Sequence, residues 1–95
     1  MSDSSSVLTE IVSLLHTPAG DRPERYVVEN TLTNGYAHAL ILEARRLRVE
    51  ERLRTAIRDG NRVAADEIAV ELARADQELA HLRGLLSTLK TQALT

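Results

Sequence analysis

The chain contains no cysteine, phenylalanine or tryptophan, and its only aromatic side chains are Tyr26 and Tyr36. The lack of cysteine excludes disulfides, thiolate metal ligands and cysteine nucleophiles. No apolar run approaches the roughly 18 residues of a membrane-spanning helix. The first residues, MSDSSSVLTE, lack the basic and long apolar regions of a signal peptide. We therefore expect a cytoplasmic protein that does not contact a membrane, with a core built from Leu, Val, Ile and Ala.

With 95 residues, 43% of them apolar and 27% charged, the sequence is that of one folded domain over residues 1–95. In its second half, apolar residues recur at alternating spacings of three and four, which is typical of the contact seam of a coiled coil. This pattern predicts a helix over about residues 62–91. Its seam residues are Ala65, Ile68, Leu72, Ala75, Leu79, Leu82, Leu86, Leu89 and Ala93.

The same spacing fits the first half and predicts a second long helix over about residues 22–58. Asp21 is suited to its N-cap, Pro23 to its first turn and Glu24 to the third position after the cap. The seam residues of this helix are Val28, Leu32, Gly35, Ala39, Leu42, Arg46, Val49, Leu53 and Ala56.

The segment Asp59-Gly60-Asn61 lies between the two long helices and predicts a tight turn. Gly60 suits the position after a helix, and Asn61 suits the N-cap of the next one. When the chain folds back here, Gly35 comes opposite Leu86, so that a small seam residue meets a large one. The expected fold is all-α: an antiparallel, coiled-coil-like helical hairpin.

The dipeptide Asn34-Gly35 allows an alternative, because it is also a common hairpin turn. The preceding stretch YVVENTLT is rich in β-branched residues, and Asn34 could cap a new helix. The position of Leu86 favours a continuous helix instead. In that interpretation Gly35 makes room for Leu86, at a cost of about 1 kcal/mol in helix propensity.

A short N-terminal helix is predicted over about residues 6–16. Ser6 can cap it, and Pro18 and Gly20 can end it. Its apolar face consists of Val7, Leu8, Ile11, Val12 and Leu15.

A second apolar stripe accompanies the seam of each long helix and predicts a further contact. On the helix 22–58 it consists of Tyr36, Leu40, Leu47 and Ile57, and on the helix 62–91 of Ala69, Ala73 and Ala80. The short helix can cover part of one stripe. A second copy of the chain can cover the rest by forming an antiparallel four-helix bundle, so we expect a homodimer. The alternative is a stripe that binds a different protein.

Glu43, Arg46 and Glu50 fall within the broad apolar face of their helix, at spacings that allow a Glu-Arg-Glu ladder. A half-buried ladder of this kind is better explained as a device that selects partner or alignment than as a source of stability. A ligand site is the alternative. Together with the four stripe residues, these three form the predicted interaction surface.

The segment from Glu43 to Arg62 contains seven arginines, and the segment from Asp66 to Glu78 contains five acids, with the end residues included. The hairpin register predicts that these charges pair across the two helices. The expected pairs are Arg54 with Asp66 and Glu67, Arg48 with Glu71, and Arg45 with Asp76. The alternative is a nucleic-acid contact by the Arg-rich segment 45–62, although it holds no aromatic residue that could stack on bases.

The sequence gives little support for a catalytic or metal site within the chain. Glu78 and His81 have the Glu-x-x-His spacing of helical di-iron sites, but both point away from the seam. His16 and His38 have no nucleophile at a motif spacing. We expect no catalytic residue, metal or cofactor, although a metal-binding bundle is a third alternative. The sequence favours a non-catalytic structural or adaptor protein that contacts itself and another protein through its helices.

Overall fold

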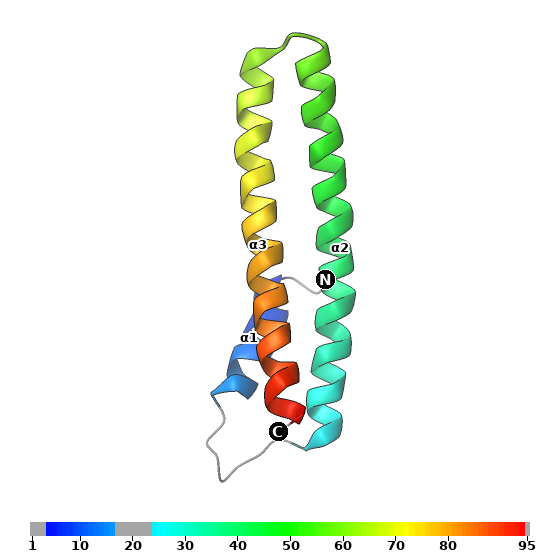
Figure 1. Ribbon diagram of the computed structural model, residues 1–95, viewed down its shortest axis with the longest axis vertical. Coiled ribbons are helices and arrows are strands. Elements are labelled where there is room, and N and C mark those ends of the chain that lie inside the picture. The colour runs from blue at the N-terminus through cyan, green and yellow to red at the C-terminus, as the bar shows by residue number, and fades with distance from the viewer. Residues whose placement is uncertain (1–3, 17–23, 95) are drawn as a thin grey trace.

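The computed structural model describes residues 4–16 and 24–94, and all three elements within these ranges are α-helices. Helix α1 spans Ser4–Leu15, α2 spans Arg25–Arg58 and α3 spans Arg62–Leu94. Helices α2 and α3 run antiparallel as a long hairpin, and α1 lies against the half that holds the start of α2 and the end of α3 (Figure 1). The molecule measures 58 × 23 × 18 Å.

The connection between α2 and α3 has the geometry that the Asp59-Gly60-Asn61 motif predicts. Gly60 has a φ of +70° and donates its N–H to the carbonyl of Ile57 at 3.1 Å, while the N–H of Asn61 reaches the carbonyl of Ala56 at 2.9 Å. These two bonds form a Schellman motif. The Asn61 side chain then accepts a hydrogen bond from the N–H of Ala64 at 3.2 Å and caps α3.

Helix α2 continues through Asn34-Gly35, so the alternative of a chain break at this dipeptide is wrong. Gly35 is buried directly against Leu86, whose side chain is only 1% exposed. A Cβ atom on Gly35 would collide with one methyl group of Leu86 and lie 3.4 Å from its Cγ. The predicted pairing of Gly35 with Leu86 is confirmed, and it brings the two backbones close together.

The helix ends differ from the sequence-based expectation in two places. Helix α1 begins at Ser4, so Ser6 lies inside the helix and does not cap it. The N-cap of α2 is Glu24, whose extended backbone carbonyl accepts the N–H groups of Val27 and Val28 at 3.0 and 3.3 Å. The bonds to this carbonyl therefore set the first turn of α2, without any side-chain cap. The expected signals at Pro18, Gly20, Asp21 and Pro23 lie outside the described residues.

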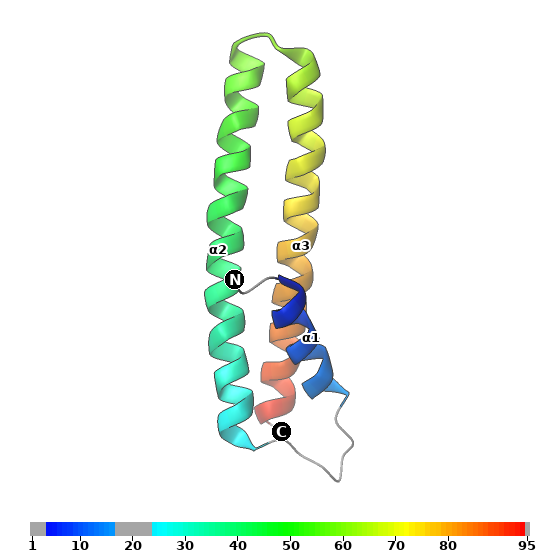
Figure 2. The ribbon, with the colours of Figure 1, turned by 180° about the vertical axis from the view of Figure 1, so that it is seen from behind.

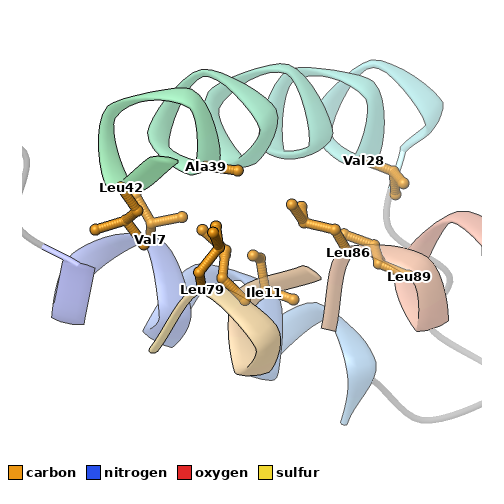
Figure 3. Close-up of a cluster of buried hydrophobic side chains, with 9 residues drawn as sticks. Val7, Ile11, Val28, Ala39, Leu42, Leu79, Leu86 and Leu89 are labelled. Atoms are coloured by element: carbon orange, nitrogen blue, oxygen red, sulfur yellow. The ribbon is translucent and has the colours of Figure 1, made fainter. Parts of the chain in front are cut away.

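The core lies where all three helices meet. Val7 and Ile11 of α1 insert among side chains of α2 and α3, and Figure 3 shows the three helices contributing to one cluster. Its buried members are Val7, Ile11, Val28, Ala39, Leu42, Leu79, Leu82, Leu86 and Leu89, with Leu32 packed against them.

Beyond the reach of α1, the hairpin consists of two helices only. Val49 and Ala56 are buried there, but the seam residues Leu53, Ile68 and Leu72 are only half-buried. Two helices cannot enclose a seam completely, because each leaves the sides of the contact open to water. The half of the hairpin near the Gly60 turn thus has the less complete core.

Candidate interaction surface

The hairpin has two flanks that differ in how they are covered. Residues directly before a seam residue share one flank, and residues directly after a seam residue share the other. On the first flank, Thr31 and His38 are buried and Leu85 is half-buried. Helix α1 lies on a single side of the hairpin, behind α3 in Figure 1 and in front of it in Figure 2. We therefore assign α1 to this flank and call the other one the open flank.

The open flank holds the apolar stripe that the sequence predicts on α2. Leu40, Leu47 and Ile57 are 67%, 61% and 64% exposed, and Tyr36 is also exposed. Helix α3 contributes small residues to the same flank, namely the exposed Ala69, Ala73 and Ala80. Large apolar side chains on one helix therefore run alongside small ones on its neighbour.

Two shallow grooves follow the line between the helices on this flank. The first has a volume of about 540 Å³ and lies at mid-length; it is lined by Glu43, Arg46, Leu47, Asp76, Leu79, Ala80 and Arg83. The second, of about 530 Å³, lies next to the turn; its lining includes Leu53, Ala56, Ile57, Ala65, Asp66 and Ala69. The apolar seam residues Leu53, Ala56 and Ala65 form the floor of the second groove, whereas the first has a single apolar seam residue, Leu79, in its lining.

Charged residues surround the floor of the first groove. Glu43 forms an ion pair with Arg83, and Arg46 forms one with Asp76, so both pairs join α2 to α3. Arg46 also donates to Glu50 at 3.0 Å. The predicted ladder is thus present in part: Arg46 pairs with Glu50, whereas Glu43 reaches across to α3 instead.

The charged form of Arg46 is stabilised by two neighbouring carboxylates. Its hydrogen bond to Asp76, together with the charge of that carboxylate, raises the pKa of Arg46 above its ordinary value, and Glu50 adds to the effect. Because the pKa moves upward from an already high value, Arg46 keeps its charge at every physiological pH. At physiological pH the groove therefore contains a charged guanidinium that pairs with Asp76 and Glu50.

The ion pairs between the helices differ in their members from those predicted. Glu71 pairs with Arg52 at 3.1 Å and not with Arg48, and Asp76 pairs with Arg46 and not with Arg45. Arg54 bonds to Glu50 at 2.6 Å and Glu51 at 3.2 Å within its own helix. The predicted pairs with Asp66 and Glu67 are absent because acids one turn away on the same helix are closer.

The three histidines belong to three different parts of the fold. His38 is buried beside the core, His16 contacts the carbonyl of Val12 at 2.8 Å at the end of α1, and His81 is exposed on α3. Among the described residues, no three His, Asp or Glu side chains come together in a way that would hold a metal ion.

Sequence reasoning missed Asp76 and Arg83 as members of the surface. The signal was available, because each directly follows a seam residue and so shares a flank with Glu43. On the opposite flank, it missed the exposure of Ile41, which is 50% exposed although it immediately precedes the buried Leu42. Helix α1 does not shield this side chain.

In comparisons with known proteins, no family model, curated protein or solved structure matches this chain. In the part of the chain that the structure describes, no helix has the length and apolar character needed to cross a bilayer.

Proposed function

We propose that this chain is a non-catalytic structural or adaptor protein that acts through helix–helix contacts, and that it works as a homodimer through its open flank. The single observation that carries the proposal is the apolar stripe of Tyr36, Leu40, Leu47 and Ile57, all of which are exposed on the open flank. Leu47 and Ile57 also line the two grooves. Large apolar side chains that gather on one exposed flank in this way often mark a protein interface.

The shape of the molecule supports the same proposal. Its radius of gyration is 17.0 Å, whereas a compact chain of this length has about 12.4 Å. Its accessible surface is 6812 Å², whereas a compact monomer of equal mass exposes about 5,400 Å². The excess is larger than the roughly 800 Å² per partner of a standard stable interface.

The test is the oligomeric state of the double variant Leu40→Glu plus Leu47→Glu. We expect the unmodified chain to scatter light as a dimer at micromolar concentration and the variant as a monomer of 10.5 kDa. The two carboxylates would have to lose water in the interface, at a cost of several kcal/mol per ion.

The matched control is Val63→Glu plus Val70→Glu. These valines of α3 are about as exposed as the two leucines. Neither valine directly follows a seam residue, so both lie off the open flank and this variant should remain a dimer. A monomeric unmodified chain would refute self-association, and equal loss of the dimer in both variants would refute the assignment to the open flank.

One observation keeps the nucleic-acid alternative worth testing. Within the described residues, Arg45, Arg48, Arg58 and Arg62 take part in no ion pair. Three of these guanidinium groups lie on α2 and the fourth lies at the first residue of α3, and unneutralised groups of this kind could contact phosphates.

A further inference from the structure

We infer that the occupant of the open flank is a second copy of this chain, placed so that Leu40 and Leu47 of α2 pack against Ala80 and Ala73 of the partner's α3. This inference rests on the proposed homodimer and adds its arrangement: a two-fold axis parallel to the helices, with both Gly60 turns at the same end. Four helices then form a square in which all neighbours are antiparallel.

The first argument is shape. On the open flank, Leu40 and Leu47 form a leucine ridge on α2, and Ala73 and Ala80 form an alanine trough on α3. A two-fold axis parallel to the helices lays each ridge over the trough of the other copy. An axis across the helices would set ridge on ridge and trough on trough, leaving gaps that close packing does not tolerate.

The second argument is height along the hairpin. Leu47 and Ala73 are separated from the turn by nearly equal lengths of helix, as are Leu40 and Ala80. A two-fold axis parallel to the helices leaves every height unchanged. Each leucine of the ridge therefore meets an alanine of the trough without any sliding of one copy along the other.

The third argument is charge. Arg54 follows the seam residue Leu53 and Asp66 follows the seam residue Ala65, so both lie on the open flank, again at matching heights. Within the described part of one copy, Asp66 has no ion pair. In the proposed dimer, the same geometry that packs Leu47 on Ala73 brings Arg54 to Asp66 of the second copy.

The ion pairs of the first groove explain why this arrangement would be specific. The clusters around Arg46 in the two copies would meet each other at mid-length, with each carboxylate already bonded to an arginine of its own copy. Sliding one copy would place these charges against leucine and alanine and desolvate them without a partner. The cluster thus sets the register, as single polar layers do in coiled coils.

The absence of native cysteine permits a direct test by disulfide cross-linking. In the double variant Leu47→Cys plus Ala73→Cys, the two thiols of one chain point away from each other, whereas those of neighbouring copies come within bonding reach. Oxidation with copper phenanthroline should convert most of the protein into a covalent dimer. A second double variant, Leu40→Cys plus Ala80→Cys, should do the same.

The controls are the single variants Leu47→Cys and Ala73→Cys, which should stay uncross-linked because identical positions lie on diagonal helices. Circular dichroism and light scattering establish that each variant is helical and dimeric before oxidation. A dimer that links through a single variant, or through neither double variant, overturns this arrangement and leaves the homodimer intact. A monomer refutes both proposals and leaves the flank to a helix of a different protein.

Discussion

Two glycines lie in the interior of the long helices, and their surroundings differ. At Gly35 the missing side chain lets Leu86 pack directly on the backbone of α2. At Gly84 an added Cβ atom would have no neighbour within 4 Å. Both residues cost their helix roughly 1 kcal/mol relative to alanine, but only Gly35 gains a close helix crossing in return.

The same substitution should therefore change stability in opposite directions at the two sites. Gly35→Leu forces a side chain into the space of Leu86 and should lower the free energy of unfolding by about 1–3 kcal/mol. Gly84→Leu should raise it by about 0.5–1 kcal/mol through helix propensity. Thermal unfolding at one fixed protein concentration measures both. An unchanged or raised melting temperature in Gly35→Leu would contradict the close crossing.

At the scale of the helices, the alternating spacing of apolar residues was sufficient to predict α2, α3 and their register. The pattern works because one contact of constant geometry runs along the whole hairpin, so each seam residue repeats the same information. The turn was predictable for a different reason: Gly60 and Asn61 each suit a backbone position that few other residues suit.

Other features of the helices and their surface depend on information that a periodic pattern does not contain. Arg52 and Arg48 both precede a seam residue, and only the path of each side chain decides that Arg52 reaches Glu71. The flank on which α1 packs was also missed. The short helix was expected to cover part of an apolar stripe, but Thr31 and His38 on the opposite flank are buried while Leu40 and Leu47 stay exposed. The N-cap of α2 is Glu24, where the sequence predicted a helix start at about residue 22, because the bonds of the first turn go to a backbone carbonyl that no side-chain pattern marks.

The cap of α3 makes the turn testable by itself. Asn61→Ala removes the oxygen that accepts the N–H of Ala64 and should lower the free energy of unfolding by about 1 kcal/mol. Asn61→Asp keeps an acceptor at the same position and should change the free energy of unfolding by only about 0.3 kcal/mol. Urea denaturation with an unchanged m-value distinguishes the two variants. Equal losses in both would show that the side-chain cap is unimportant.

For the molecule as a whole, the balance of charge between α2 and α3 separates the two leading functions. Arg46 and Arg52 are neutralised by acids of α3, and Arg54 is neutralised within α2. An adaptor needs these pairs for alignment and has no use for selective phosphate contacts. A nucleic-acid regulator would instead use the arginines that remain without an acid, and both classes of arginine can be changed separately.

The variant Arg45→Gln plus Arg48→Gln removes two arginines that make no ion pair in the described part of the chain. Its free energy of unfolding should therefore change by less than about 0.5 kcal/mol. The matched variant Arg52→Gln breaks the pair with Glu71 and should cost up to about 1 kcal/mol. Labelled DNA and RNA oligonucleotides should bind every variant weakly and without selectivity at about 150 mM salt, because counterion release alone would drive such binding and salt suppresses it. Selective binding by the unmodified chain that Arg45→Gln plus Arg48→Gln abolishes, with folding and the dimer intact, would replace the adaptor with a nucleic-acid regulator.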